Sequence, residues 1–156
     1  MTTKEFLNQA YRIDQRINSK LEQIKNLREL ATKATSTISE TGVRDSGNNQ
    51  RMESNVVKIV DLEREINEDI DMLIEVKKGI MAMIKKVENP EYQTLLELRY
   101  LCFKRWEQIA LDMDYSIQHT FRIHNKALEK IKFFKDESGQ GMVEYALIIA
   151  LIAVVV

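Results

Sequence analysis

The sequence predicts an all-α fold: a long antiparallel helical hairpin, then a small helix-turn-helix domain, then a C-terminal apolar helix. Helix breakers are scarce, because the 156 residues include one proline and five glycines. Four of these glycines lie in two short stretches, as Gly42 and Gly47 and as Gly139 and Gly141. Elsewhere apolar residues recur at steps of three and four, the spacing of one face of an α-helix. We therefore expect helix nearly everywhere outside those stretches.

The hairpin is predicted from two apolar stripes within residues 1–88. The first helix is expected to begin near Thr3, which can cap it, and its stripe consists of Phe6, Ala10, Ile13, Ile17, Leu21, Ile24, Leu27 and Ala31. Residues from about 37 to 52 lose the period and gather Gly, Ser, Asn and Asp, which predicts a loop. The second stripe consists of Val56, Ile59, Leu62, Ile66, Ile70, Leu73, Val76, Ile80, Met83 and Val87. Two such helices bury their stripes most simply against each other.

A second domain is predicted over residues 89–134. Asn89 and Pro90 form a good helix start, because asparagine caps the first turn and proline is tolerated at the first helical position. After this helix come a short helix, Trp106 to Met113, and a longer helix from about 117 to 131. A short helix, a tight turn and a longer helix make up the helix-turn-helix plan.

The predicted turn has suitable chemistry. Asp114 follows the short helix, at a position that often requires a left-handed backbone, which glycine adopts most readily and aspartate tolerates. Ser116 can accept hydrogen bonds from the first amides of the next helix. The apolar residues of the two helices are expected to face each other, with Ile109, Ala110 and Met113 opposite Ile123, Ala127 and Ile131.

The outer face of the longer helix is polar. Side chains on this face reach base edges and phosphates when such a helix lies in a major groove. The candidate DNA-binding residues are therefore Gln118, His119, Arg122, Asn125 and Lys126. Residues 90–135 contain eight Lys and Arg against six Asp and Glu, so sequence-independent attraction to DNA is expected to be weak. The alternative is that this domain is a helical bundle that binds no ligand.

The segment WEQIALDMDYSIQHTFRIHNKALEKI resembles the DNA-binding helix-turn-helix of sigma factor region four. It departs from that pattern at Asp114, where glycine is usual, and at Thr120, where a buried valine is common. The Thr120 hydroxyl is therefore expected to form a hydrogen bond within the helix. Residues from about 1 to 131 are also similar to small helical proteins of phages and prophages of Gram-positive bacteria, which stand near phage late-gene transcriptional activators. The resemblance implies a transcriptional regulator of phage or prophage type that reads promoter DNA with residues 117–131.

For such a regulator the expected partners are double-stranded DNA and a second copy or RNA polymerase bound by the hairpin. An enzyme is not expected, because the sequence has no glycine-rich phosphate loop and no nucleophile elbow. Neither a cofactor nor a metal is expected, since His119 and His124 do not share a helix face. Cys102 lies in an apolar stretch and is predicted to be buried and reduced. The amino terminus lacks a secretory signal, so residues 1–134 are expected in the cytoplasm.

The last residues, 131–156, follow a different pattern, with a predicted leader junction and apolar segment over 135–156. Basic residues precede Gly139, four residues follow it, and then Glu144 and Tyr145 open an apolar run. This arrangement resembles the start of a Flp-type pilin precursor. The resemblance implies cleavage by a prepilin peptidase after Gly139, which would leave the amino group of Gln140 as the counter-charge for Glu144.

The uninterrupted apolar run, Ala146 to Val156, has eleven residues, whereas roughly twenty are needed to span a bilayer. Inner-membrane association of residues 142–156 is nevertheless expected from its hydrophobicity. The alternative function is therefore a pilin-like or membrane-tethered structural protein, or a chimeric reading frame in which two genes join near Lys130 to Lys132.

Overall fold

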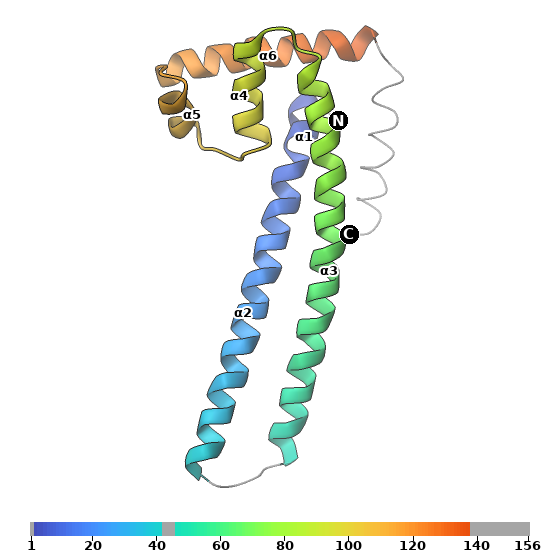
Figure 1. Ribbon diagram of the computed structural model, residues 1–156, viewed down its shortest axis with the longest axis vertical. Coiled ribbons are helices and arrows are strands. Elements are labelled where there is room, and N and C mark those ends of the chain that lie inside the picture. Colours follow the sequence, from blue (N-terminus) through green and yellow to red (C-terminus); the bar gives the residue numbers. More distant parts are fainter. Residues whose placement is uncertain (1, 42–45, 138–156) are drawn as a thin grey trace. The chain divides into compact units, whose positions relative to one another are not determined.

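A computed structural model of the chain describes residues 2–41 and 46–137, and every regular element in these two ranges is a helix. Figure 1 shows the six helices, whose bounds are α1 Thr3–Leu7, α2 Gln9–Thr41, α3 Ser46–Lys85, α4 Pro90–Tyr100, α5 Trp106–Asp112 and α6 Ile117–Glu137. The all-helical prediction is confirmed for this part of the chain. The predicted C-terminal apolar helix lies beyond it, apart from residues 135–137, which continue α6.

The chain divides into two compact units, and the division differs from the boundary expected at residue 88. The hairpin unit is Ile13–Asp71, and the second unit, which contains α4 to α6, combines Met1–Arg12 with Met72–Val156. The amino-terminal residues join the second unit because Phe6, Leu7 and Ala10 are buried there and α1 packs against α6. Sequence periodicity alone does not reveal this, since the apolar stripe of α2 continues unbroken from one unit into the other.

The amino terminus is capped by Thr2, so the prediction that Thr3 caps the helix is wrong. The Glu5 amide donates to the Thr2 hydroxyl over 3.2 Å, and the Thr2 amide donates to the Glu5 carboxylate over 2.7 Å. This reciprocal arrangement is a capping box, which satisfies two backbone donors that the helix leaves unpaired. Thr3 is instead buried, and α1 ends at Leu7, with Asn8 separating it from α2.

In the hairpin unit, α2 and α3 run antiparallel, as their cross-helix ion pairs show. Arg16 pairs with Asp69, Lys20 lies 3.2 Å from Glu65, and Arg28 lies 3.1 Å from Glu63, so residue numbers fall on α3 as they rise on α2. Asp69 also accepts a 2.7 Å hydrogen bond from Lys20. Burial raises the pKa of the Asp69 carboxyl, but hydrogen bonds from Arg16 and Lys20 outweigh it, and the net pKa is lowered.

The predicted loop of residues 37–52 is too long. Residues up to Thr41 are helical, and helix resumes at Ser46. Serine, asparagine and glycine each weaken a helix by about 1 kcal/mol or less, and residues that favour helix, Gln50 to Met52, follow directly. A loss of apolar periodicity therefore did not mark the end of the helix.

Burial along the two predicted stripes is incomplete in the hairpin unit. The buried apolar side chains described there are Ile13, Ile17, Ile24 and Ile66. Three residues that the stripes placed inside are exposed instead, namely Leu21, Val56 and Ile70. The hairpin unit thus has a thin apolar seam, and a group of charges in which the Asp69 carboxylate is largely buried supplements it.

The second unit has the denser core. Asn89 caps α4 as predicted, because its side-chain oxygen accepts from the Glu91 amide at 2.9 Å and from the Tyr92 amide at 3.4 Å. Helix α6 packs against α1, α4 and α5. A central cluster of Leu95, Ile109 and Ile123, one from each of α4, α5 and α6, is surrounded by partly buried apolar residues.

Candidate nucleic-acid interface

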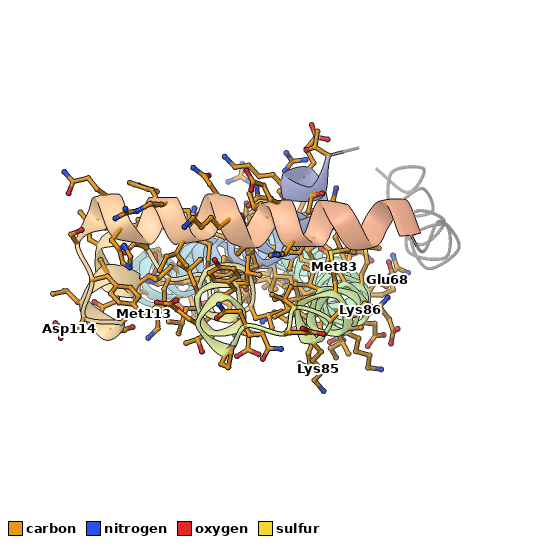
Figure 2. All side chains as sticks on the ribbon, turned by 90° about the horizontal axis from the view of Figure 1, so that it is seen from above. Glu68, Met83, Lys85, Lys86, Met113 and Asp114 are labelled. Carbon is orange, nitrogen blue, oxygen red and sulfur yellow. The ribbon has the colours of Figure 1, made fainter. Side chains whose placement is uncertain are left out.

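The turn between α5 and α6 has the backbone that the sequence predicted. Asp114 has a φ of 57°, in the left-handed region. The Tyr115 amide donates to the Ala110 carbonyl over 2.8 Å, and the Asp114 amide donates to the Leu111 carbonyl over 3.2 Å. These two bonds are those of a Schellman motif, which closes a helix and satisfies its last carbonyls. Figure 2 shows Met113 and Asp114 at this turn, where Asp114 is exposed.

The start of α6 is fixed by Ser116. The His119 amide donates to the Ser116 hydroxyl over 3.2 Å, which confirms the predicted cap. Thr120 is fully buried, and its hydroxyl donates to the Ser116 carbonyl over 2.9 Å. The polar residue that departs from the sigma pattern is therefore satisfied inside the helix, as it must be to avoid an unpaired buried hydroxyl.

The inner face of α6 determines which of its residues face outward. Ile123, Ala127 and Ile131 are buried, as are Ile109 and Ala110 of α5. These are the residues predicted to meet across the motif, and only Met113 is less than fully buried. Because burial fixes the rotation of α6, residues on its other side must face solvent.

The predicted DNA-binding residues lie together on that outer side. The side chains exposed there are Gln118, Arg122, Asn125 and Lys126, while His119 is half-buried. A helix rises about 1.5 Å per residue, so the nine positions from 118 to 126 extend over roughly 12 Å. The diameter of an α-helix with its side chains, about 10–12 Å, fits a DNA major groove, which is about 12 Å wide.

A chain of contacts positions Arg122. The Tyr115 hydroxyl donates to the Glu91 carboxylate, which together with desolvation raises the pKa of Tyr115. The His119 ring lies edge-on to the Tyr115 ring, with centroids 4.6 Å apart. An Arg122 nitrogen lies 3.0 Å from His119 Nδ1. Arginine can only donate, so Nδ1 accepts this bond, and His119 serves mainly to orient Arg122.

Sequence reasoning missed an exposed aromatic residue on the same helix. Phe121 is 41% exposed although it is large and apolar. Its ring centroid lies 5.0 Å from that of Trp106, and the Arg99 guanidinium covers the Trp106 ring at 4.6 Å. The spacing could have revealed it, since Phe121 lies three residues after Gln118 and four before Asn125 and therefore shares their face.

The second histidine of the unit is structural. His124 is buried and lies 2.7 Å from the Tyr100 hydroxyl through Nε2, with Trp106 edge-on at 4.7 Å. Burial, aided by the positive charges of Lys4 and Arg99, lowers the pKa of His124 to about 4. Burial also raises the pKa of Tyr100 to about 12. Both groups are therefore neutral at physiological pH and belong to the core.

Cys102 is exposed, so the prediction that it is buried is wrong. It follows the end of α4, where Phe103 adopts a φ of 58°. Phe103 instead makes the inward contacts, with its ring 5.6 Å from that of Tyr11 and 4.7 Å from the Lys77 ammonium. The left-handed residue turns the chain at this point, so the apolar neighbours of Cys102 in sequence do not surround it in space.

Within the part of the chain that the structure describes, no group of three or more His, Cys, Asp or Glu side chains is arranged to hold a metal ion. No helix in the same residues has the length and hydrophobicity needed to cross a membrane. The predicted processing residues Gly139, Gln140, Glu144 and Tyr145 lie outside the described residues.

Comparison with known protein families gives a match. A family model described as "Protein of unknown function (DUF1492)" matches residues 33–132, which include most of the hairpin and all of α4 and α5. A search of curated proteins found no match, and neither did a search of solved structures.

Proposed function

The chain belongs to the DUF1492 family, and we propose that this member binds double-stranded DNA through the outer face of α6 and regulates transcription. The observation that supports the proposal is that the turn between α5 and α6 and the exposed polar side of α6 both fit a DNA-reading motif. The Schellman turn at Asp114 and the cap at Ser116 give α5 and α6 the short helix, tight turn and longer helix that a helix-turn-helix needs, and the side of α6 that the core leaves exposed is polar and suited to base contacts. A bundle without a ligand would not require that combination.

Each outer residue has a distinct proposed role. The Arg122 guanidinium, held by His119, can donate two parallel hydrogen bonds to a guanine. Gln118 and Asn125 carry amides of the kind that pair with adenine. Lys126 lies one helical turn after Arg122 and supplies a phosphate contact, which positions the helix on the DNA without reading the base sequence.

Phe121 adds an apolar contact to this set. Aromatic and other apolar side chains in a major groove contact the methyl group of thymine. The Trp106 ring holds Phe121 on the side of α6 that carries Gln118 and Asn125. We therefore assign Phe121 to a thymine within the site.

Charge indicates how strongly the unit depends on base contacts. Eight basic residues against six acidic ones in residues 90–135 give little general attraction to DNA, and the Asp112 carboxylate already occupies the Lys104 ammonium at 2.6 Å. Few phosphate contacts imply a shallow dependence of affinity on salt. Specific contacts and a second bound copy must therefore supply most of the affinity. The resemblance to phage regulators makes promoter DNA and RNA polymerase the expected partners.

The experiment starts from a random pool of DNA duplexes, from which the full-length protein selects its site. Arg122→Ala is expected to weaken binding of the selected duplex by about 1–3 kcal/mol and to relax preference at one base pair. Lys126→Ala should weaken binding of all sequences alike and reduce the salt slope by about 1. The control, Arg51→Ala with Lys58→Ala, removes two exposed charges from the hairpin unit. Equal binding by the α6 variants and the control would refute the assignment.

A second function is supported by one observation. The family match ends at residue 132, close to the point where the sequence begins to resemble a pilin precursor. We propose for this tail that prepilin peptidase cleaves after Gly139, with Glu144 and Tyr145 as the recognised pair. Mass spectrometry of the protein from cells with and without the peptidase tests this. A new amino terminus at Gln140 supports a processed subunit, and an intact chain in both strains refutes it.

A further inference from the structure

The hairpin unit carries several large apolar side chains that are exposed. Leu21 is 49% exposed, Val56 and Val60 are each 57% exposed, and Ile70 is 39% exposed. Burial of such side chains is the main source of stability for a helix pair. The hairpin unit buries only four described apolar side chains of its own, so these exposed residues mark a surface that can still be covered.

The four residues share one face of the hairpin, which the ion pair between Arg28 and Glu63 identifies. Residues three, four or seven apart lie on the same face of a helix. Leu21 precedes Arg28 by seven positions on α2. On α3, Val56 and Val60 precede Glu63 by seven and three positions, and Ile70 follows it by seven. Since Arg28 and Glu63 meet across the hairpin at 3.1 Å, both sets lie on the same side, which we name the Leu21 face.

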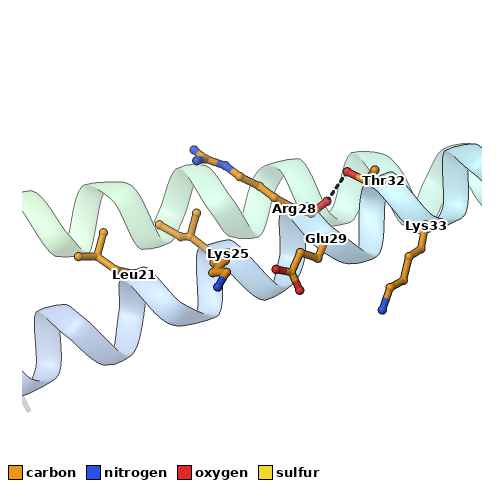
Figure 3. Close-up of a pocket in the computed structure, with 7 residues that line it drawn as sticks. Leu21, Lys25, Arg28, Glu29, Thr32 and Lys33 are labelled. Carbon is orange, nitrogen blue, oxygen red and sulfur yellow. Dashed lines mark hydrogen bonds between the residues drawn. The ribbon is translucent and has the colours of Figure 1, made fainter.

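Figure 3 shows the α2 part of the Leu21 face. Leu21, Lys25, Arg28 and Thr32 follow one another along the helix, and the Thr32 hydroxyl bonds to the Arg28 carbonyl at 2.9 Å. Together with Ile24 they line a shallow open groove. From position 56 to position 70 the α3 part of the face extends over roughly 21 Å.

We propose that a second copy of this chain covers the Leu21 face. Its four apolar side chains expose on the order of 300 Å² of apolar surface to solvent, and the aliphatic stems of Lys25 and Arg28 add to this area. A standard interface buries about 800 Å² per partner, of which a little over half is apolar. The Leu21 face therefore supplies most of the apolar area that a stable dimer needs.

Charge selects the arrangement of the two copies. Residues 13–41 contain five Lys and Arg against four Asp and Glu, whereas residues 46–71 contain three against seven. Placing α2 of one copy over α3 of the other brings a nearly neutral helix onto an acidic one, whereas placing like helices over each other brings the two acidic α3 helices together. A two-fold axis parallel to the helices achieves the favourable pairing and makes every neighbouring pair antiparallel. The product is a four-helix bundle.

The test compares two leucines on opposite sides of α2. Leu30 is 56% exposed and lies nine positions after Leu21, which is two and a half turns and therefore the other side of the helix. Leu30 lines a different groove from the one that Leu21 lines, together with Leu27, Lys58 and Leu62. Leu21→Glu and Leu30→Glu thus make the same chemical change at similar exposure, and only the first places a charge on the Leu21 face.

Sedimentation equilibrium of the full-length protein measures the outcome. The wild type and Leu30→Glu are expected at twice the chain mass of 18.2 kDa, and Leu21→Glu at the chain mass with unchanged helical circular dichroism. If Leu21→Glu loses helicity, Val60→Asp on α3 replaces it and should also give a monomer. A monomeric wild type overturns the proposal, even if RNA polymerase binds that face. So does an assembly that Leu30→Glu dissociates and Leu21→Glu does not.

Discussion

Acidification should destabilise the second unit, which contains α4 to α6, through His124. Its pKa is about 4 in the folded protein against an ordinary value of 6.5. Between these pH values the unfolded chain binds a proton that the folded chain does not, so the stabilising contribution is complete above pH 6.5 and is lost as pH falls to 4. A difference of roughly 2.5 in pKa corresponds to about 3 kcal/mol. The groups that face the ring, Tyr100 at 2.7 Å and the nearby cations Lys4 and Arg99, offer it no negative charge.

The assay is urea unfolding followed by the fluorescence of Trp106, the single tryptophan, whose ring is 4.7 Å from the His124 ring. Free energies of unfolding are measured at pH 7, 6, 5 and 4. His124→Gln keeps a hydrogen-bonding side chain for Tyr100 but cannot titrate, so its stability should fall by about 3 kcal/mol less than that of the wild type over this range.

His119→Gln is the matched control, because it makes the same substitution on the same helix at a half-exposed position. It should retain the full pH dependence of the wild type. The Asp69 carboxyl, whose pKa is lowered below 3.8, loses its contribution only at pH values below this range. Identical pH dependence in the wild type and His124→Gln would refute the reasoning.

Three further predictions concern the turn, the hairpin and the DNA contact. Asp114→Val should lower the free energy of unfolding by about 1–2 kcal/mol because a branched residue resists a positive φ, whereas Asp114→Gly should change it little; equal effects in thermal melts would contradict this. Asp69→Asn should lower the free energy of unfolding by roughly 2 kcal/mol, because it removes a largely buried charge that Arg16 binds. Glu63→Gln, at an exposed ion pair, should lower it by less than about 0.5 kcal/mol. Urea titrations measure both values, and equal losses would contradict this prediction. Replacing one thymine of the selected site by uracil removes only a methyl group and should weaken binding by the wild type, whereas Phe121→Ser should bind both duplexes equally. A loss of affinity that persists with Phe121→Ser in binding titrations would exclude the assigned contact.

Local chemistry predicted the turn between α5 and α6 and the caps of α4 and α6 closely. Asp114, Ser116 and Asn89 act through bonds to residues no more than a few positions away, so the sequence contains nearly all the information that determines their conformation. The outer face of α6 followed as well, because burial of Ile123 and Ala127 leaves only one orientation for that helix.

Features that depend on distant packing were harder to predict. The apolar stripe of α2 does not show that residues up to Arg12 belong to a different unit from Ile13 onward. Leu21 and Val56 match the helical period as well as Ile17 does, yet they are exposed, because a period identifies an apolar face and not the partner that covers it. The burial of Cys102 was predicted wrongly for a related reason, because the left-handed turn at Phe103 changes the direction of the chain.

The assignment of base reading to α6 is tested most directly by changing what one residue reads. Gln118 is exposed in the first turn of α6, where such helices contact base edges. Selection of a site from random duplexes is performed with the wild type and with Gln118→Arg, because glutamine favours adenine and arginine favours guanine. The two selected sites are expected to differ at a single base pair, with guanine replacing adenine. Identical sites, or no selected site with either protein, would contradict the assignment.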